Sequence, residues 1–346
     1  MESILITSAD KRMDSKPKGS DIMVSYLPDG DRLSYYYWDD WALSGLLAPG
    51  GHTLTLGIGG GAGLQRLAKI DPSHQQTGVD LNLSVLRGLP PRTEAVEGDA
   101  VHYIKNGNSR FDSVWIDLYD GKGGMVMDIL STQFLQALSG RLASDGLCFI
   151  HIFRPENRFY RYARKHDPFE PLLLAHLASQ GYHASLFDRF ASQTWVISRR
   201  PRTELHTRLR EIASTQGEPV RSWMLDYMLP IFRAPSSASP REIGVPELAA
   251  ALRQPVAEEA LKSCGLSPKS GAADWDAWSD APLRLLEAVP SGSPRERLVW
   301  ETLAAWTTAP GLDLPAPCRA YLTRVLADHA KTDCPELELR RAIITS

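Results

Sequence analysis

The sequence predicts an α/β protein in which a doubly wound, mainly parallel sheet follows an N-terminal β-hairpin and precedes a helical C-terminal extension. Three observations predict this class. Between residues 53 and 200, short apolar runs alternate with helical segments, the pattern of strand–helix–strand units. A glycine-rich turn follows the first apolar run, at Gly57 to Gly61. Beyond residue 203, leucine- and alanine-spaced helices replace that alternation.

The N-terminal segment, residues 1–50, contains the predicted hairpin. Two β-rich runs in "DIMVSYLPDGDRLSYYYWDDW" flank Pro28 to Asp31, where proline and glycine favour a turn. Aromatic residues follow that turn, and they either wall a pocket or pack as a half-buried face: Tyr35, Tyr36, Tyr37, Trp38 and Trp41.

The central domain, residues 51–202, supplies the sheet. Strands are expected at Thr53–Ile58, Thr77–Leu81, Glu94–Glu97, Ser113–Leu118 and Leu147–Phe153. Helices are expected between them at Leu64–Ile70, Leu83–Leu89, Ala100–Asn106 and Ile129–Ala143. A helix at Pro171–Gln180 precedes two strand-like runs within residues 182–200, which are too close in sequence for a parallel crossover. This last pair is therefore expected to be antiparallel.

Composition excludes several classes of protein. The 346 residues contain 38 Lys and Arg against 41 Asp and Glu, so no net positive field favours nucleic acid or an anionic membrane. The four cysteines form no CxxC pair, and no apolar run reaches the roughly 18–20 residues of a membrane span. These features predict a cytoplasmic, disulfide-free protein. The histidines show no metal-site spacing, and no metal is expected.

The glycine stretch "GIGGGA" predicts a nucleotide site. Residues 57–62, with Gly57, Gly59 and Ala62 at the fixed positions and Gly60 and Gly61 between them, satisfy the pattern G-x-G-x-x-G/A, in which backbone N–H groups and a helix N-terminus approach a ligand closely. Asp80 follows about twenty residues later, at the end of the next strand, from which a carboxylate binds a ribose diol. NAD and S-adenosylmethionine both carry this ribose, so Asp80 does not choose between them.

Later strand ends favour a cationic ligand. Asp99 follows the third strand, where it either approaches an adenine amino group or caps a helix, and Asp117, Tyr119 and Asp120 follow the fourth. The carboxyl ends of parallel strands share one edge of a sheet, so these carboxylates are expected to converge. An anionic mouth disfavours a pyrophosphate dinucleotide and favours a sulfonium, an amine or both.

The order GIGGGAG, VDLN, GDA and IDLYDG, between a tyrosine-rich hairpin and an antiparallel strand pair, resembles the spermidine synthase-like branch of the class I S-adenosylmethionine-dependent methyltransferases. The resemblance spans about residues 22–200 and implies a seven-stranded Rossmann-like sheet that binds S-adenosylmethionine or its decarboxylated form. It implies cofactor contacts from Gly57, Gly59, Gly60, Gly61, Asp80, Leu81, Asp99 and Ala100. It also implies an amine-orienting, proton-accepting role for Asp117, with Asp120 as the acid three residues further on.

Two departures from that family favour methyl transfer to a small amine-bearing metabolite. Aminopropyl-transferring members read GGGDGG, whereas this chain has Ala62 in place of the aspartate, and the Tyr-His-Glu cluster that holds a diamine is absent. In this scheme Asp117 or Asp120 accepts a proton and Tyr119 positions the acceptor. Three alternatives stay open: attack on another sulfonium carbon with release of methylthioadenosine (aminopropyl or aminocarboxypropyl transfer, or cyclisation), a non-catalytic homologue, and an NAD-dependent dehydrogenase. The extension, residues 203–346, is interpreted as a lid or an oligomer contact, and a homodimer stays open.

Overall fold

The computed structural model describes residues 33, 37–86, 88–120, 124–153, 167–188, 192–234 and 238–254. The chain divides into two compact units, and these residues lie almost entirely in the unit formed by Ser15–Phe153 and Pro168–Leu252. The predicted hairpin turn and the part of the extension beyond residue 254 lie outside the described residues. None of the helices in the described part has the length and apolar character that a membrane crossing requires.

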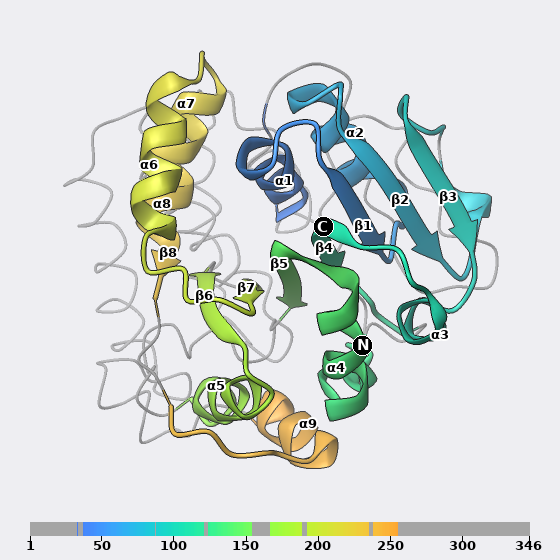
Figure 1. Cartoon of the computed structure of the whole chain (residues 1–346), viewed down its shortest axis with the longest axis vertical. Coiled ribbons are helices and arrows are strands. Elements are labelled where there is room, and N and C mark those ends of the chain that lie inside the picture. Colours follow the sequence, from blue (N-terminus) through green and yellow to red (C-terminus); the bar gives the residue numbers. More distant parts are fainter. Residues whose placement is uncertain are drawn as a thin grey trace, which may run out of the picture. The chain divides into compact units, whose positions relative to one another are not determined.

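An eight-stranded sheet forms the centre of the unit, in the order β3-β2-β1-β4-β5-β7-β6-β8 (Figure 1). Strands β1 to β5 pair in parallel, whereas β7 runs antiparallel to both β5 and β6. The order therefore reverses between β1 and β4, where such sheets bind ligands at the carboxyl ends of the strands. The strands are β1 (His52–Leu56), β2 (Gln75–Asp80), β3 (Thr93–Glu97), β4 (Phe111–Ile116), β5 (Leu142–Phe153), β6 (His183–Asp188), β7 (Ser192–Ser198) and β8 (Phe232–Arg233).

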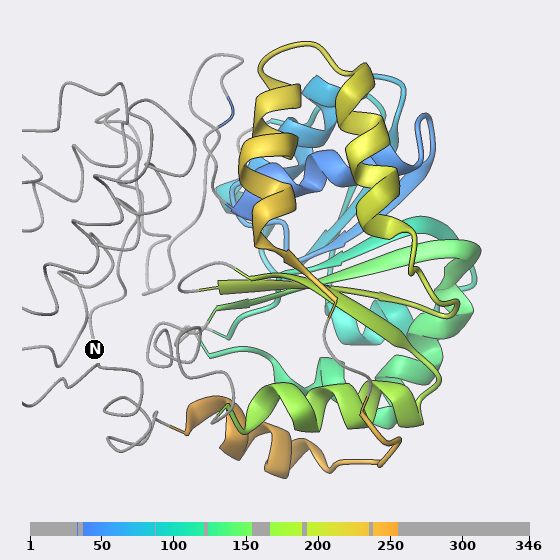
Figure 2. The ribbon, with the colours of Figure 1, turned by 90° about the vertical axis from the view of Figure 1, so that its left-hand side faces the viewer.

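Helices cover both faces of this sheet (Figure 2). One face carries α1 (Ala42–Leu47), α2 (Ala62–Ile70), α6 (Leu205–Thr215), α7 (Val220–Ser222) and α8 (Leu229–Ile231). The other carries α3 (Ala100–Asn106), α4 (Thr132–Arg141), α5 (Phe169–Ser179) and α9 (Val245–Arg253). Shorter helical segments are η1 (Tyr37–Trp41), η2 (Leu83–Val85), η3 (Met127–Leu130) and the π-helical η6 (Trp223–Met228).

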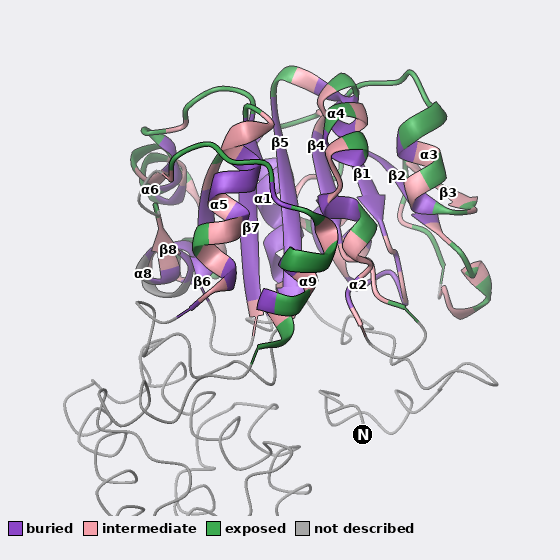
Figure 3. Ribbon diagram, turned by 90° about the horizontal axis from the view of Figure 1, so that it is seen from below, coloured by how far each residue is buried: buried purple, intermediate pink, exposed green. Residues whose placement is uncertain are grey.

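The central strands are buried on both faces, and the exposed residues lie on the outer surfaces of the helices (Figure 3). Aromatic stacking anchors η1 to this core. The ring of Trp115 in β4 stacks against Trp41 on one side and Phe149 on the other, with centroids 4.1 Å apart in each case. Such pairs add stabilisation beyond the apolar area they bury, so the segment that follows the predicted hairpin is held against the sheet.

The predicted strand–helix alternation and the antiparallel closing pair are confirmed, and α3 has the expected bounds. The prediction of a helix at Leu83–Leu89 is wrong, because only the short η2 forms there. Leu89 is 45% exposed, whereas Leu83, Val85 and Leu86 are partly buried, so the apolar residues of this segment do not form one buried helical face. Gly88 also adopts a positive φ of 75°, which a continuing helix does not allow. Strand β8, two residues long, was not predicted.

A chain of buried polar groups joins the strands toward their amino ends. The ring Nε2 of His74 lies 2.7 Å from Thr53 Oγ1, which lies 2.6 Å from Ser113 Oγ. Ser113 Oγ in turn donates to Ser44 Oγ at 2.7 Å. Because each of these buried groups has a partner, the chain links β1 to β4 without an orphaned polar atom.

We expect the protein to lose stability as the pH falls below about 6.5. Burial lowers the pKa of His74 and, together with the nearby His74 charge, that of His52, from the ordinary value of 6.5. The unfolded chain then binds more protons than the folded chain below pH 6.5, so the free energy of unfolding is largest above that value and decreases on acidification. Urea midpoints at pH 7.5 and 5.5 measure this loss. His52→Gln should reduce it, whereas Gln at the exposed His183 should not; equal losses in wild type and His52→Gln would contradict the assignment.

Candidate functional site

The glycine turn lies at the carboxyl end of β1 and leads into α2. Gly57 and Gly61 adopt φ values of 85° and 87°, and Gly61 is the N-cap of α2. A Cβ atom on Gly57 would collide with the backbone carbonyl oxygen of Asp117, so the ends of β1 and β4 approach each other as only glycine allows. The turn that the sequence assigned to a nucleoside therefore also has a packing role.

Asp80, at the end of β2, fixes the shape of that turn. Its Oδ2 accepts hydrogen bonds from the backbone N–H groups of Ile58 and Gly59, at 2.8 and 2.9 Å. Its Oδ1 accepts from the N–H of Asn82 at 3.1 Å, and no second donor to Oδ1 is found among the described residues. A carboxylate oxygen accepts two hydrogen bonds, so Oδ1 retains capacity for a ligand hydroxyl.

The remaining proposed cofactor contacts flank this carboxylate. Leu81 is 73% exposed next to Asp80. Asp99 caps α3, because its Oδ1 accepts from the N–H of His102 at 2.7 Å, and Ala100 is buried at the start of that helix. The helix-cap alternative for Asp99 is therefore realised, and an adenine contact would have to share this carboxylate.

Asp117 follows β4 and is paired with a histidine that the sequence did not assign to the site. Its Oδ1 lies 2.8 Å from Nδ1 of His151, which is near the end of β5. The ring of Tyr37 stacks on the imidazole, with centroids 3.8 Å apart and an angle of 1° between the planes. The site thus contains an Asp–His pair covered by an aromatic ring.

The Tyr119 hydroxyl is hydrogen-bonded to the protein backbone. The hydroxyl donates to the carbonyl oxygen of His151 at 3.2 Å and accepts from the N–H of Phe153 at 2.7 Å. Burial, reinforced by the negative charge of Asp117, raises the pKa of the Tyr119 phenol well above 10. The phenol is therefore neutral at pH 7, and it fixes the loop after β4 to the end of β5.

Asp120 belongs to the turn beyond these residues. Its Oδ1 accepts from the N–H of Gly124 at 2.8 Å, and its own N–H donates to the carbonyl of Gly124 at 2.7 Å. The residue is exposed. Hydrogen bonds therefore join Asp117 and Tyr119 to His151, while the hydrogen bonds between Asp120 and Gly124 close a surface turn.

Buried polar contacts tie the η1 segment to α2 and to β7. Nε of Arg66 in α2 donates to Oδ1 of Asp39 in η1 at 2.6 Å, and both side chains are at most 2% exposed. Thr194 of β7 donates to Oδ2 of Asp40 at 2.9 Å, and Asp40 is also buried. Sequence reasoning missed these contacts, because the partners are far apart in the chain and neither belongs to a local motif.

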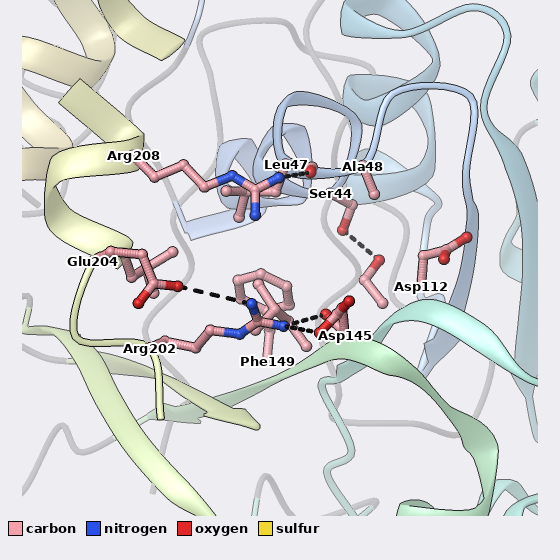
Figure 4. A pocket seen from close by; sticks show the side chains of 12 residues that line it. Ser44, Leu47, Ala48, Asp112, Asp145, Phe149, Arg202, Glu204 and Arg208 are labelled. Carbon is pink, nitrogen blue, oxygen red and sulfur yellow. Dashed lines mark hydrogen bonds and ion pairs between the residues drawn. The ribbon is translucent and has the colours of Figure 1, made fainter. Parts of the chain in front are cut away.

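A separate cavity of about 30 Å³ lies toward the amino ends of β4 and β5 (Figure 4). Ser44, Asp112, Phe149, Arg202 and Arg208 are among the residues that line it. A volume of this size accommodates about one water molecule, so the cavity is too small for a nucleoside. It also lies at the opposite edge of the sheet from Asp80 and Asp117. Among the described residues, no group of three metal-ligating side chains is found.

Comparisons with known proteins were made against families, curated proteins and solved structures. No family model matches the chain. The polyamine aminopropyltransferases of two Neisseria meningitidis strains, of serogroups A and B, are each 26% identical over 124 residues, which is 33% of this chain. The chain spans only 46% of the length of these curated relatives.

Solved structures of low identity were also found. A probable spermidine synthase from Corynebacterium glutamicum is 16% identical, with a TM-score of 0.43, over 64% of this chain and 84% of that one. Human Methyltransferase-like protein 13 in complex with SAH is 15% identical, with a TM-score of 0.38, over 65% of this chain and 94% of that one.

The sheet order and the antiparallel β7 define a Rossmann-like fold of the methyltransferase type, and this fold prediction is confirmed. Strand β8 adds an edge to the expected seven strands. In sequence, the chain is similar to the polyamine aminopropyltransferases over the 124 matched residues.

Proposed function

We propose that the protein is an S-adenosylmethionine-dependent transferase that methylates a small amine-bearing metabolite. The observation that carries this proposal is the carboxyl edge at the β1–β4 switch point, where Asp80 braces the glycine turn and Asp117 ends the adjacent strand. Carboxylates at this edge suit a sulfonium nucleoside and an amine, and they repel a pyrophosphate.

The cofactor would bind along the first three strand ends. The glycine turn would approach the donor, Oδ1 of Asp80 would accept a ribose hydroxyl, and the exposed Leu81 would cover the base beside Asp99 and Ala100. When bound, the donor supplies an electrophilic carbon attached to a positively charged sulfur. Its displacement needs an aligned, deprotonated nucleophile, so the protein contributes chiefly proximity, orientation and removal of a proton.

The choice of methyl transfer rests on what the first helical segments contain. Ala62 is 2% exposed in α2, so this position offers no carboxylate to a donor's amino-bearing arm. Asp39 and Asp40 of η1 are buried and engaged by Arg66 and Thr194, so they do not replace the diamine-holding cluster of the aminopropyl-transferring enzymes.

Aminopropyl transfer from the decarboxylated donor is the second candidate. The sequence match to polyamine aminopropyltransferases over 124 residues favours it. The two candidates differ in the nucleoside released: S-adenosylhomocysteine after methyl transfer and methylthioadenosine after aminopropyl transfer. Mass spectrometry after incubation with each donor and a metabolite extract distinguishes them, even while the acceptor is unidentified.

Titration calorimetry tests the cofactor. We expect S-adenosylhomocysteine to bind and Asp80→Ala to weaken its binding by about 10- to 100-fold, since a hydrogen bond to a charged group contributes roughly 1.5–3 kcal/mol. Alanine at the exposed Asp145, at the amino end of β5, is the matched control and should leave the affinity unchanged. Tight binding of NADH alone would overturn the proposal, and unchanged affinity in Asp80→Ala would remove the ribose assignment.

A further inference from the structure

His151 has one nitrogen with a partner and one without. Its Nδ1 lies 2.8 Å from the Asp117 carboxylate, whereas Nε2 is buried and has no hydrogen-bond partner among the described residues. The side chain is only 3% exposed. An unsatisfied buried polar atom is costly and uncommon in a folded protein, which points to a ligand or substrate contact at Nε2.

The pairing sets the tautomer of the neutral imidazole. An ionised carboxylate only accepts hydrogen bonds, so the Asp117 contact places the hydrogen on Nδ1. Nε2 then carries a lone pair and is an acceptor. The parallel Tyr37 ring holds the plane of the imidazole. The Tyr119 hydroxyl accepts from the N–H of Phe153 and donates to the carbonyl of His151, so it holds the backbone at the end of β5 in place.

We propose that Nε2 of His151 is the catalytic proton acceptor of the transferase and that Asp117 is its positioning residue. This inference rests on the proposed function and reassigns the role that the sequence gave to Asp117. The acceptor's nitrogen forms a bond to the donor carbon, the carbon–sulfur bond breaks, and its electron pair stays on the neutral thioether. The proton leaves the nitrogen for Nε2, and Asp117 faces the imidazolium that forms.

The groups packed around His151 suit a positive charge on the ring. Asp117 and the neutral Tyr119 face it from beyond β4, and the Tyr37 ring faces it from η1. On β7 its register partner is Thr194, whose hydroxyl donates to Asp40. Two carboxylates and no cation are found among these surrounding residues, so the imidazolium formed when the ring takes the substrate proton would lie beside negative rather than positive charge.

A spectroscopic measurement tests the pair without turnover. Nitrogen NMR of histidine-labelled protein at neutral pH should show hydrogen on Nδ1 and none on Nε2 of His151, assigned by the loss of its signals in His151→Gln. In Asp117→Asn the preference should shift toward hydrogen on Nε2. A wild-type ring with hydrogen on Nε2 would overturn the inference even if the protein binds the nucleoside.

Kinetics test the proton transfer itself. We expect His151→Gln to lower kcat by about 10²- to 10⁴-fold while the Kd for S-adenosylhomocysteine changes less than about threefold, and His183→Gln to leave both unchanged. The smaller His151→Gly variant should regain turnover with added imidazole, which a merely structural histidine would not show. Unaltered kcat in His151→Gln contradicts this inference alone, whereas absence of nucleoside binding by the wild type contradicts the proposed function and the inference with it.

Discussion

Replacing Asp39 with asparagine should lower the free energy of unfolding by about 3–5 kcal/mol. Asp39 and Arg66 are an ion pair with N–O distance 2.6 Å, and both side chains are at most 2% exposed. The substitution keeps the shape of the side chain but removes the negative charge that faces the Arg66 guanidinium. A buried charge that loses its counter-charge is poorly solvated, so the cost exceeds the net contribution of the pair.

Urea denaturation monitored by tryptophan fluorescence measures this loss. Removing both charges, in Asp39→Asn with Arg66→Met, should restore part of the stability. The double variant no longer buries the Arg66 charge opposite a neutral side chain. The exposed pair of Arg241 and Glu247 provides the control, and Glu247→Gln should cost no more than about 1 kcal/mol. A loss below that value in Asp39→Asn would show that water reaches the pair.

Gly57→Ala should have the second large effect, a loss of roughly 2–5 kcal/mol. The residue has a φ of 85°, which disfavours any side chain, and the added Cβ meets the carbonyl of Asp117. Relief of that contact requires the ends of β1 and β4 to separate. Because Asp117 orients His151, binding of the nucleoside and the tautomer of His151 should change together.

Gly140→Ala is the matched control for this substitution. Gly140 lies within helix α4, and a Cβ there meets no atom within 4 Å. Alanine should therefore raise the free energy of unfolding by roughly 0.5–1 kcal/mol, as expected for glycine replacement inside a helix. If Gly57→Ala were as well tolerated as Gly140→Ala, the close approach of β1 and β4 would be in error.

Local pattern sufficed for most of the fold. The apolar alternation predicted the strands to within a few residues, and the short separation of the last two strands predicted their antiparallel pairing. The pattern failed at Leu83–Leu89, where only the three-residue η2 forms, and it did not show β8, which forms by pairing with β6. Both failures reflect tertiary contacts that a local window does not contain.

The candidate site was less accessible to sequence reasoning. The motifs located Gly57, Asp80 and Asp117 at one edge of the sheet, since strand ends in such a fold share an edge; their roles stay predictions. His151 was interpreted as part of a strand, because a single polar residue in "CFIHIF" does not disturb the pattern of a buried strand. Its significance depends on Asp117 and Tyr37, which lie 34 and 114 positions away in the sequence.

The packing of the glycine turn bears on how related sequences are classified. Gly57 is required by the carbonyl of Asp117, and a Cβ on Gly63 would meet the Trp41 ring at 2.6 Å. A descendant that had lost its ligand would still need both glycines to fold. A database screen on the glycine signature would therefore collect inactive members together with enzymes. Side chains with a proposed catalytic role, such as His151 with its unsatisfied Nε2, would separate the two groups better than the glycines do.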